Sequence, residues 1–384
     1  MISVFHVRNS NYPGGIETTL LGWFRAIDPS RFNMRLFVFR ERGNIHERSV
    51  RLMAENGVQS DFLPWGHMRN LPGAVHALVK EIRAENHVIV HSHDARSDVV
   101  ALLAARLTGA PVIASNHAWH AVGFKRRIME YVRGKLLPLV DLVLNVSEDT
   151  HQETVRRGVP QIKSMPLYSG IDLLPFERIM DRDAVRTGLG LGADEFVASN
   201  VARLWPEKAQ DALIEAVSLL GQAGRPMKLL IVGDGPLEAS LRKQAIALGV
   251  ESSVVFLGFR SDYADIMNAS DAFVFPSSAE GTPMVLYGAM AMRLPIIAST
   301  VAGNAEILAN NDTALLVPPA NALALRDALQ QLIDNPVLGR RLGEQAYAVV
   351  HERYSVDKTV RNLEAIYERF FVHGRGRPTK GRRT

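Results

Sequence analysis

Two cations stand where an anion could bind. Arg203 follows the apolar run over 196–202, and Lys208 opens the helical stretch that continues over 209–220. At a strand end and a helix start, two such side chains could hold a diphosphate through charge-assisted hydrogen bonds. The alternative interpretation is a pair of solvated surface cations. The pair therefore predicts a phosphate site only together with other residues.

Other turns between an apolar run and a helical stretch could also contact a ligand. Gly14 and Gly15 let the backbone approach a ligand closely, and the helix after them offers free N–H groups to an anion. Gly233 and Gly235 share this freedom. Glu280 precedes a helix start, where a carboxylate usually caps the helix but can bind sugar hydroxyls if it points into a cleft. The first turn is not G-x-G-x-x-G, which counts against a dinucleotide site.

The elements that must position these residues are visible as continuous apolar runs separated by helical stretches. Strands buried on both faces give such runs, and intervening helices imply parallel pairing. The sequence therefore predicts an α/β fold of two doubly wound parallel-sheet domains, with a ligand cleft between them. The runs are 3–7, 34–39, 87–93, 111–115 and 142–147 in the first half, and 196–202, 228–233, 253–258, 272–277, 295–300 and 314–319 in the second.

The segment over 171–192 is polar and punctuated by proline and glycine, which predicts a domain boundary near residue 178. The expected division is a first domain over 1–178 and a second over 179–353. Val360, Leu363, Ile366 and Tyr367 share a helical spacing, so we expect a closing amphipathic helix over 354–372 and a basic, disordered tail over 373–384.

The composition narrows the function classes. The chain has 384 residues, 47% of them hydrophobic and none of them cysteine, which excludes disulfides, thiolate metal sites and a cysteine nucleophile. The net charge of +4 combines +5 over 1–178, −6 over 179–372 and +5 in the tail. A basic first half favours an anionic partner, and the acidic half argues against nucleic acid. No run is long enough to span a membrane, so we expect a cytoplasmic protein.

Taken in chain order, these residues resemble the retaining glycosyltransferases of the GT-B fold, especially sequence family 4. Each motif is weak alone, but together they cover nearly the whole chain in the family's order and spacing. The resemblance implies two Rossmann-like domains facing across a cleft, with the last helix packing back on the first domain. The motifs are Gly14-Gly15, Asn116-His117, Arg203 with Lys208, Gly233-Asp234-Gly235-Pro236, Glu280-Gly281 and Gly303-Asn304-Ala305-Glu306.

The resemblance also implies roles for residues. The second domain would bind a nucleotide-sugar donor and the first an acceptor, with two cations neutralising the leaving nucleotide in place of a metal. We therefore expect neither a metal nor a cofactor. The implied catalytic residues are Glu280, His117, Arg203 and Lys208; the donor residues are Gly14, Gly15, Arg203, Lys208, Gly233, Gly235, Phe259, Glu280, Gly281, Thr282 and Pro283; the acceptor residues are His93, Asn116 and His117.

Two patterns invite a metal instead. Asp181 and Asp183 spell the D-x-D of metal-dependent transferases, but they lie in the linker on a helical stretch rather than at a strand end. His91 and His93 are two residues apart at a strand end, and His93 is as consistent with a satisfied polar group as with a ligand contact. Neither pattern displaces the metal-independent interpretation.

The expected reaction moves a hexose from a UDP- or GDP-linked donor to a glycan or lipid-linked acceptor, in cell-surface polysaccharide assembly. Retention without an obvious nucleophile suggests front-side displacement, in which the leaving phosphate helps to deprotonate the acceptor. Two alternatives stay open: a GT-B relative with other chemistry, such as a nucleotide-sugar epimerase or a phosphorylase, and a non-catalytic partner subunit.

One position departs from the family pattern. The family usually carries a second glutamate, which binds the nucleotide's ribose, eight residues after the first, and this chain has Gly288 there. Its absence puts donor affinity in doubt and admits an inactive relative. On the sequence alone, Gly288→Glu should tighten nucleotide binding and remove a glycine from a helix interior.

The segment over 124–137 interleaves five cations with apolar side chains. Such a helix can lie on an anionic membrane surface, at the inner face of a plasma membrane. An ordinary amphipathic helix with a solvated basic face explains the pattern nearly as well.

Overall fold

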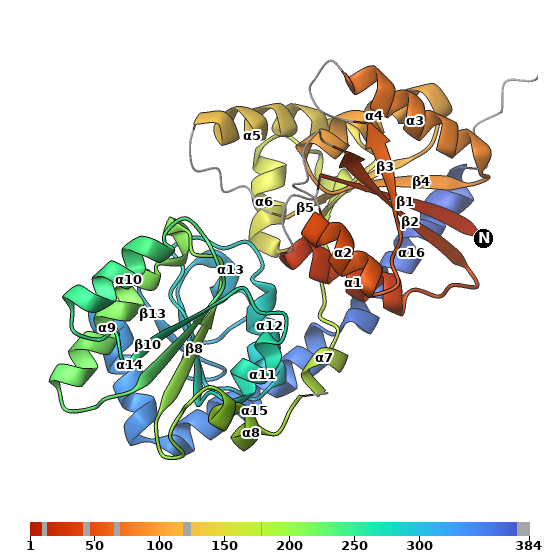
Figure 1. Ribbon diagram of the computed structural model, residues 1–384. Helices are drawn as coiled ribbons and strands as arrows, with labels where there is room; N and C mark the ends of the chain where they lie inside the picture. The colour runs from red at the N-terminus through yellow and green to blue at the C-terminus, as the bar shows by residue number, and fades with distance from the viewer. Residues whose placement is uncertain (10–13, 41–46, 65–69, 118–123, 178, 375–384) are drawn as a thin grey trace, which may run out of the picture. The chain divides into compact units, whose positions relative to one another are not determined.

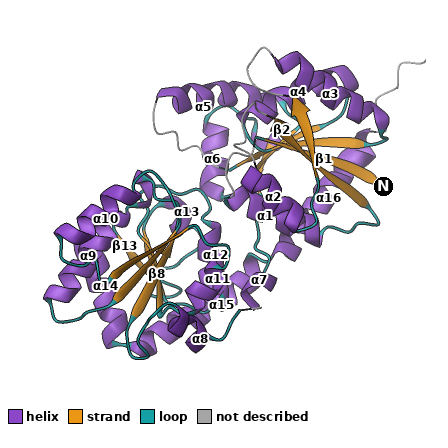
Figure 2. Cartoon of the chain, in the orientation of Figure 1, coloured by secondary structure: helices purple, strands orange, loops and turns teal. Residues whose placement is uncertain are grey.

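The computed structural model describes residues 1–9, 14–40, 47–64, 70–117, 124–177 and 179–374 (Figure 1). The chain forms two compact units. One comprises Met1–Gly170 together with Val356–Thr384, and the other comprises Ile171–Ser355. Both are α/β, as the sequence predicts, with strands flanked by helices (Figure 2).

The first unit is built on a seven-stranded sheet in the order β3-β2-β1-β4-β5-β6-β7, with every neighbouring pair parallel. Its strands are β1 (Ile2–Arg8), β2 (Phe32–Arg40), β3 (Ser60–Pro64), β4 (Val88–Ser92), β5 (Val112–Asn116), β6 (Leu142–Asn145) and β7 (Ser164–Pro166). Its helices are α1 (Gly15–Ala26), α2 (Glu47–Glu55), α3 (Leu71–Ala84), α4 (Ala95–Thr108), α5 (Phe124–Leu136), α6 (Glu148–Arg156) and α16 (Val356–Gly374), with short 3₁₀ turns η2 (Leu137–Leu139) and η3 (Gln161–Lys163).

Alternating residues of β1, β2, β4, β5 and β6 fill two cores, one on each face of this sheet. In β1, Phe5 and Val7 belong to one core, whereas Ile2 and Val4 belong to the other. Because side chains of a strand point alternately to opposite faces, a strand covered on both faces must be apolar at nearly every position. This explains why the strands read as continuous apolar runs.

The last helix returns to the first unit. Val360, Leu363, Ile366 and Tyr367 of α16 are buried in the core that contains Ile2 and Val4. In Figure 1 this helix is blue and lies beside the red and orange elements of the N-terminal unit. The helical spacing of the four apolar side chains therefore identified the buried face correctly, and the C-terminal helix packs on the N-terminal domain as predicted.

The second unit is built on a six-stranded parallel sheet in the order β10-β9-β8-β11-β12-β13. Its strands are β8 (Val197–Val201), β9 (Lys228–Val232), β10 (Val254–Gly258), β11 (Ala272–Phe275), β12 (Ile296–Ser299) and β13 (Leu315–Val317). Its helices are α7 (Leu174–Glu177), α8 (Arg182–Gly188), α9 (Gln210–Gln222), α10 (Glu238–Ala247), α11 (Tyr263–Asn268), α12 (Met284–Ala291), α13 (Ala302–Ala305), α14 (Ala322–Asp334) and α15 (Pro336–Arg353), with the 3₁₀ turn η4 (Pro206–Lys208).

The structure corrects some expectations about boundaries. The units divide between residues 170 and 171 rather than near 178, and the Ile171 N–H donates to the Tyr354 carbonyl within the second unit. The closing helix begins at Val356, not at 354, and the tail beyond 374 lies outside the described residues. Strands β3 and β7 were not predicted, since each is short and neither is a continuous apolar run.

Candidate functional site

In each sheet, the strands that follow the first strand in sequence are added on one side of it, and the later strands are added on its other side. In the first unit β1 lies between β2 and β4, and in the second β8 lies between β9 and β11. In doubly wound sheets, ligands bind beyond the carboxyl ends of the two strands that flank this switch point. The segments after β1 and β4, and those after β8 and β11, are therefore where a ligand is expected in each unit.

The second unit brings predicted residues together at its switch point. Lys208 follows β8 and donates a hydrogen bond to Glu280, which follows β11, and the two side chains are only 13% and 10% exposed. The Lys208 ammonium also lies 5.2 Å from the centroid of the Phe275 ring. The pair thus offers a ligand an ammonium that could hold a phosphate and a carboxylate that could accept from a hydroxyl.

The turn that carries Lys208 is strained. Lys208 ends the turn η4 instead of opening the helix directly, and Ala209 has the left-handed φ of 51° before α9 begins. For a residue with a Cβ this conformation costs about 1–2 kcal/mol. The Ser278 N–H donates to the Glu207 carbonyl at 2.8 Å, so the loops after β8 and β11 are joined next to Lys208. Strain of this kind is typical of ligand sites.

Arg203 and Phe259 offer exposed surface in the same unit. The Arg203 side chain is 54% exposed, with its guanidinium 3.9 Å from Glu207 and 5.5 Å from the centroid of the Trp205 ring. Phe259 is 52% exposed and follows Gly258, whose carbonyl accepts a hydrogen bond from the Gly233 N–H. A guanidinium and an aromatic ring are thus accessible to an anionic, planar ligand.

The glycines after β9 contact the chain's own backbone. A Cβ at Gly233 would lie 2.0 Å from the Ala202 carbonyl oxygen, and one at Gly235 would lie 2.4 Å from the Leu204 carbonyl oxygen. The absence of side chains therefore lets this turn pack against the segment that carries Arg203. Close approach of a donor to either glycine stays a prediction.

The segment after Glu280 is positioned by another glycine. A Cβ at Gly303 of α13 would meet the Gly281 carbonyl oxygen at 2.1 Å. The buried Asn304 side chain donates to the carbonyl and the hydroxyl of Ser299 at 3.0 and 3.1 Å, which fixes α13 on β12. Thr282 and Pro283 complete the link to α12, and Pro283 occupies its N-cap position.

The position that departs from the family pattern is covered by an aromatic ring. Gly288 lies in α12, and a Cβ there would stand 2.6 and 2.8 Å from two ring carbons of Phe176. Phe176 is 7% exposed and packs edge-on against Tyr263. The ring leaves no room for a side chain at residue 288 unless it moves, so Gly288→Glu cannot simply add a carboxylate as the sequence alone suggested.

In the first unit, the start of α1 carries an internal carboxylate. The Gly14 N–H donates to Glu17 Oε2 at 3.0 Å, and the Arg8 guanidinium donates to Glu17 Oε1 at 2.7 Å. Glu17 is buried, whereas Gly14 and Gly15 are exposed. Glu17 therefore neutralises part of the positive end of this helix.

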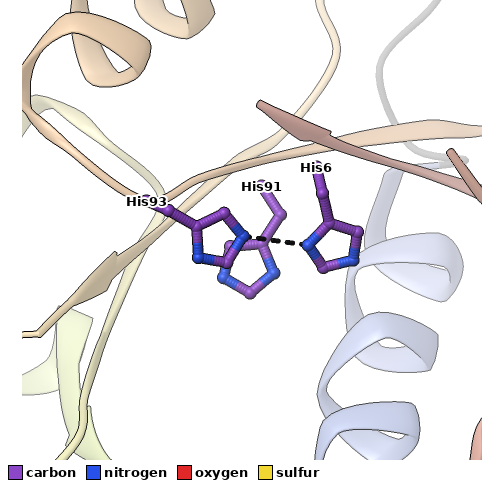
Figure 3. Close-up of side chains that lie close together, drawn as sticks. All are labelled: His6, His91 and His93. Atoms are coloured by element: carbon purple, nitrogen blue, oxygen red, sulfur yellow. Dashed lines mark hydrogen bonds between the residues drawn. The ribbon is translucent and has the colours of Figure 1, made fainter. Parts of the chain in front are cut away.

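Buried histidines gather at the switch point of the first sheet (Figure 3). His6 of β1 stands beside His91 of β4 in the parallel register, and His6 Nδ1 lies 2.9 Å from His93 Nε2. His93 Nδ1 lies 3.4 Å from His117 Nε2, so both predicted histidines belong to one cluster. His6 was not among the predicted site residues, because a single histidine in an apolar strand gives no distinctive signal.

Three of these rings are close enough to raise the question of a metal. The ligand atoms of His6, His91 and His93 lie within 4.8 Å of one another. However, the two nitrogens of His91 are each 2.8 Å from a hydroxyl, one of Tyr367 and one of Ser115. His6 Nδ1 and His93 Nε2 also face each other at 2.9 Å, so a metal held by the three rings would have to break these contacts.

Burial sets the protonation of this cluster. It lowers the pKa of His6 to about 3, and it lowers the pKa values of His91, His93 and His117 well below 6.5. Nearby positive charge from Arg8 lowers the pKa of His93 and His117 further. All four rings are therefore neutral at pH 7.

Asn116 is held by other buried groups. It accepts from Arg133 at 2.9 Å and donates to Thr154 at 2.9 Å. Arg133 also donates to the fully buried Asp98 at 2.8 Å, and burial raises the pKa of that carboxyl. The described contacts thus give Asn116 a place in a structural network, and an acceptor contact stays a prediction. Sequence patterns gave no signal for Asp98, since its partner is 35 residues away.

The other aspartate pattern has a structural explanation. Asp181 is the N-cap of α8, and its carboxylate accepts a hydrogen bond from the Ala184 N–H at 3.0 Å. The helical stretch expected at these aspartates is therefore present, and Asp181 caps it.

Comparisons with known proteins identify the family. The model of the family "Glycosyl transferases group 1" matches residues 181–349, and that of "Glycosyltransferase Family 4" matches residues 13–173. A GDP-mannose-dependent monoacylated alpha-(1-6)-phosphatidylinositol monomannoside mannosyltransferase of Corynebacterium glutamicum is 30% identical over 366 residues, covering 89% of this chain and 91% of the relative.

Other similar proteins point the same way. The UDP-Gal:alpha-D-GlcNAc-diphosphoundecaprenol alpha-1,3-galactosyltransferase of Escherichia coli is 27% identical, over 88% of this chain and 89% of its own length. Among solved structures, Anabaena Alr3699/HepE in complex with UDP-glucose has a TM-score of 0.84 at 20% identity, and it covers 96% of this chain and 100% of its own. The structural likeness supports the fold.

Proposed function

Because this chain belongs to the GT-B glycosyltransferases resembling sequence family 4, we propose that it transfers a hexose from a UDP- or GDP-linked donor to a glycan or lipid-linked acceptor, with retention of the anomeric configuration. Relatives whose names specify UDP-Gal, GDP-mannose, a diphosphoundecaprenol or a phosphatidylinositol acceptor support this choice of substrates. Cell-surface polysaccharide assembly is the process that fits such acceptors.

The observation that carries the proposal is the contact between Lys208 and Glu280 beyond the strands that flank the second switch point, with the exposed Arg203 on the same segment after β8. Two cations there can hold the diphosphate and stabilise the charge that grows on it as the sugar leaves. Glu280, already beside Lys208, can accept hydrogen bonds from sugar hydroxyls. We propose that this pair of cations does the work that a metal does in other transferases.

The proposed displacement takes place on one face of the sugar. The bond from the anomeric carbon to the phosphate oxygen breaks while a bond to the acceptor oxygen forms on the same face. The acceptor's proton passes to the departing phosphate oxygen. The protein's residues contribute orientation and charge stabilisation, which can supply most of the barrier reduction for such a transfer.

A screen of thermal stability with UDP, GDP, ADP and their sugars tests the donor class, and stabilisation by none of them would contradict the proposal. Transfer rates then test the cations. Arg203→Ala and Lys208→Ala should each cost about 2–4 kcal/mol of transition-state stabilisation. Arg225→Ala is the matched control, because Arg225 is also half-exposed but pairs with Asp334 away from the site. Activity of the first two variants within twofold of wild type would refute the assignment.

We further propose that α5 rests on an anionic membrane surface while a lipid-linked acceptor is used. Ile128, Met129, Tyr131 and Val132 are all exposed large side chains on this helix. Arg133 is buried against Asp98, so the five-cation face expected from the sequence loses one member. None of the described helices combines the length and apolarity needed to cross a membrane.

Sedimentation with anionic liposomes tests this surface. Tyr131→Ser with Ile128→Ser should weaken binding, because exposed apolar side chains and nearby cations together drive interfacial adsorption. Leu107→Ser on α4 is the control, since Leu107 is 61% exposed, a value between those of Ile128 and Tyr131, and lies elsewhere in the same unit. Equal binding by the wild type, the double variant and Leu107→Ser would contradict the proposal. So would the absence of a preference for anionic lipid at low salt.

A further inference from the structure

Three imidazoles form a hydrogen-bonded series in the first unit. His6 of β1 contacts His93, which follows β4, at 2.9 Å between Nδ1 and Nε2. His93 in turn contacts His117, which follows β5, at 3.4 Å between Nδ1 and Nε2. Figure 3 shows the first of these contacts as a dashed line between the two rings. The series therefore runs from the core to the end of the sheet where a ligand is expected.

Each ring of the series carries a single proton. His6 and His93 are 0% and 2% exposed, so charging them would remove a cation from water with no carboxylate among their described hydrogen-bond partners. Burial accordingly lowers the pKa of all three rings. A neutral imidazole has one donor nitrogen and one acceptor nitrogen, so a partner at one nitrogen fixes the role of the other.

His6, at the inner end of the series, sets the direction in which each ring donates its N–H. His6 Nε2 is buried and has no hydrogen-bond partner among the described residues. Orphaned buried N–H groups are rarer than orphaned acceptors, so the His6 proton belongs on Nδ1, where it is donated to His93 Nε2. His93 must then carry its own proton on Nδ1 and donate it to His117 Nε2. His117 is left with its proton on Nδ1, the nitrogen outside the series.

We propose that His6 and His93 are positioning residues that lock His117 in the tautomer protonated on Nδ1, so that His117 offers a ligand a hydrogen-bond donor and no base. Its acceptor nitrogen is already occupied by His93. The ligand atom it recognises is an oxygen that accepts, such as a sugar ring, carbonyl or phosphate oxygen. This last step rests on the proposed function, whereas the tautomer does not.

His91 lies outside the series and provides the control. It neighbours His6 in the strand register and is equally buried, but its nitrogens contact Tyr367 and Ser115. Replacing His91 disturbs the same core without removing a member of the series. A change seen in a His6 variant and not in a His91 variant therefore reports the series and not general loosening.

The experiment records nitrogen-15 spectra of histidine-labelled full-length protein at pH 7.5 without ligand. Long-range nitrogen–proton correlations distinguish the two neutral tautomers, and the His117 signals are identified by their loss in His117→Gln. Wild type and His91→Leu should show His117 protonated on Nδ1. His6→Leu removes the first donor, so His117 should become a mixture of tautomers. His6→Asn places an amide N–H near the Nδ1 position and should restore the single tautomer.

His117 protonated on Nε2 in the wild type would overturn the proposal, as would an unchanged single tautomer in His6→Leu. If His6→Leu does not fold, the wild-type and His6→Asn spectra still decide, because a wild-type mixture or an Nε2 proton contradicts the inference. None of these spectra depends on sugar transfer. An inactive protein with the expected tautomers would refute the proposed function alone, and an active protein with the wrong tautomer would refute only the positioning role.

Discussion

The contact between Gly288 and Phe176 predicts that even a methyl group at residue 288 is destabilising. A Cβ there would lie 2.6 Å from the Phe176 ring, which is 7% exposed and has Tyr263 beside it. Forcing extra volume into such packing costs about 1–3 kcal/mol. Replacing a glycine inside a helix by alanine returns about 1 kcal/mol. Gly288→Ala should therefore lower the free energy of unfolding by up to about 2 kcal/mol.

A matched glycine separates the two effects. Gly221 lies in α9 of the same unit, and a Cβ there would meet nothing within 4 Å. Gly221→Ala should therefore gain the helix-propensity term without the packing cost. Since about 1 kcal/mol corresponds to roughly 2–4 °C in a unit of this size, the melting temperature of Gly288→Ala should fall several degrees below that of Gly221→Ala. Differential scanning fluorimetry measures this difference.

The same contact governs whether a carboxylate at this position can help to bind a nucleotide. Gly288→Glu alone should not tighten UDP or GDP binding measured by calorimetry, because the Phe176 ring occupies the space. Phe176→Ala alone should cost about 3–5 kcal/mol, as for other buried aromatics. The variant that combines Gly288→Glu with Phe176→Ala should lose less unfolding free energy than the sum of the two single losses. The difference should be about 1–3 kcal/mol, because removing the ring relieves the packing at residue 288. Gly288→Ala as stable as Gly221→Ala, together with additive losses in the double variant, would refute the reasoning.

The remaining predictions concern charge and protonation. Arg133→Met should lower the free energy of unfolding by about 3–5 kcal/mol at pH 7, because it leaves the Asp98 carboxylate buried without its partner. The loss of unfolding free energy, measured by urea titration, should shrink as the pH falls toward 5. Burial raises the pKa of Asp98, so at the lower pH the folded variant takes up the proton that neutralises this carboxylate. A loss that does not depend on pH would contradict this. Burial lowers the pKa of His6 to about 3, so below about pH 6 the unfolded chain binds this proton first. As the pH falls, the free energy of unfolding of the wild type should therefore decrease by about 1.4 kcal/mol per pH unit more than that of His6→Leu. Parallel curves of unfolding free energy against pH for the two proteins would argue against a neutral His6. If two cations replace a metal, EDTA should leave the rate of sugar transfer unchanged, and a strict requirement for Mg²⁺ or Mn²⁺ would oppose the mechanism.

The sequence by itself determined the parts of this protein that depend on local patterns. Continuous apolar runs predicted β1, β8 and most other strands, because a strand buried on both faces must be apolar at nearly every position. The family resemblance grouped Arg203, Lys208 and Glu280, because the order of the short segments that carry them is written in the chain, and their roles stay predictions. The return of α16 to the first domain followed from the family resemblance and from its apolar face.

Only the tertiary structure decided which distant side chains meet. Lys208 and Glu280 are 72 residues apart, and His6 and His93 are 87 residues apart. A periodic pattern of apolar residues indicates that one face of a helix or strand is buried, but it does not identify the segment that packs on that face. Phe176 shows this most clearly, because its segment looked like a polar linker, and only the folded second unit places its ring over Gly288 and reverses the expectation for a carboxylate there. The tautomer of His117 is decided in the same way, since strand order brings three neutral rings into a series that no spacing in the sequence records.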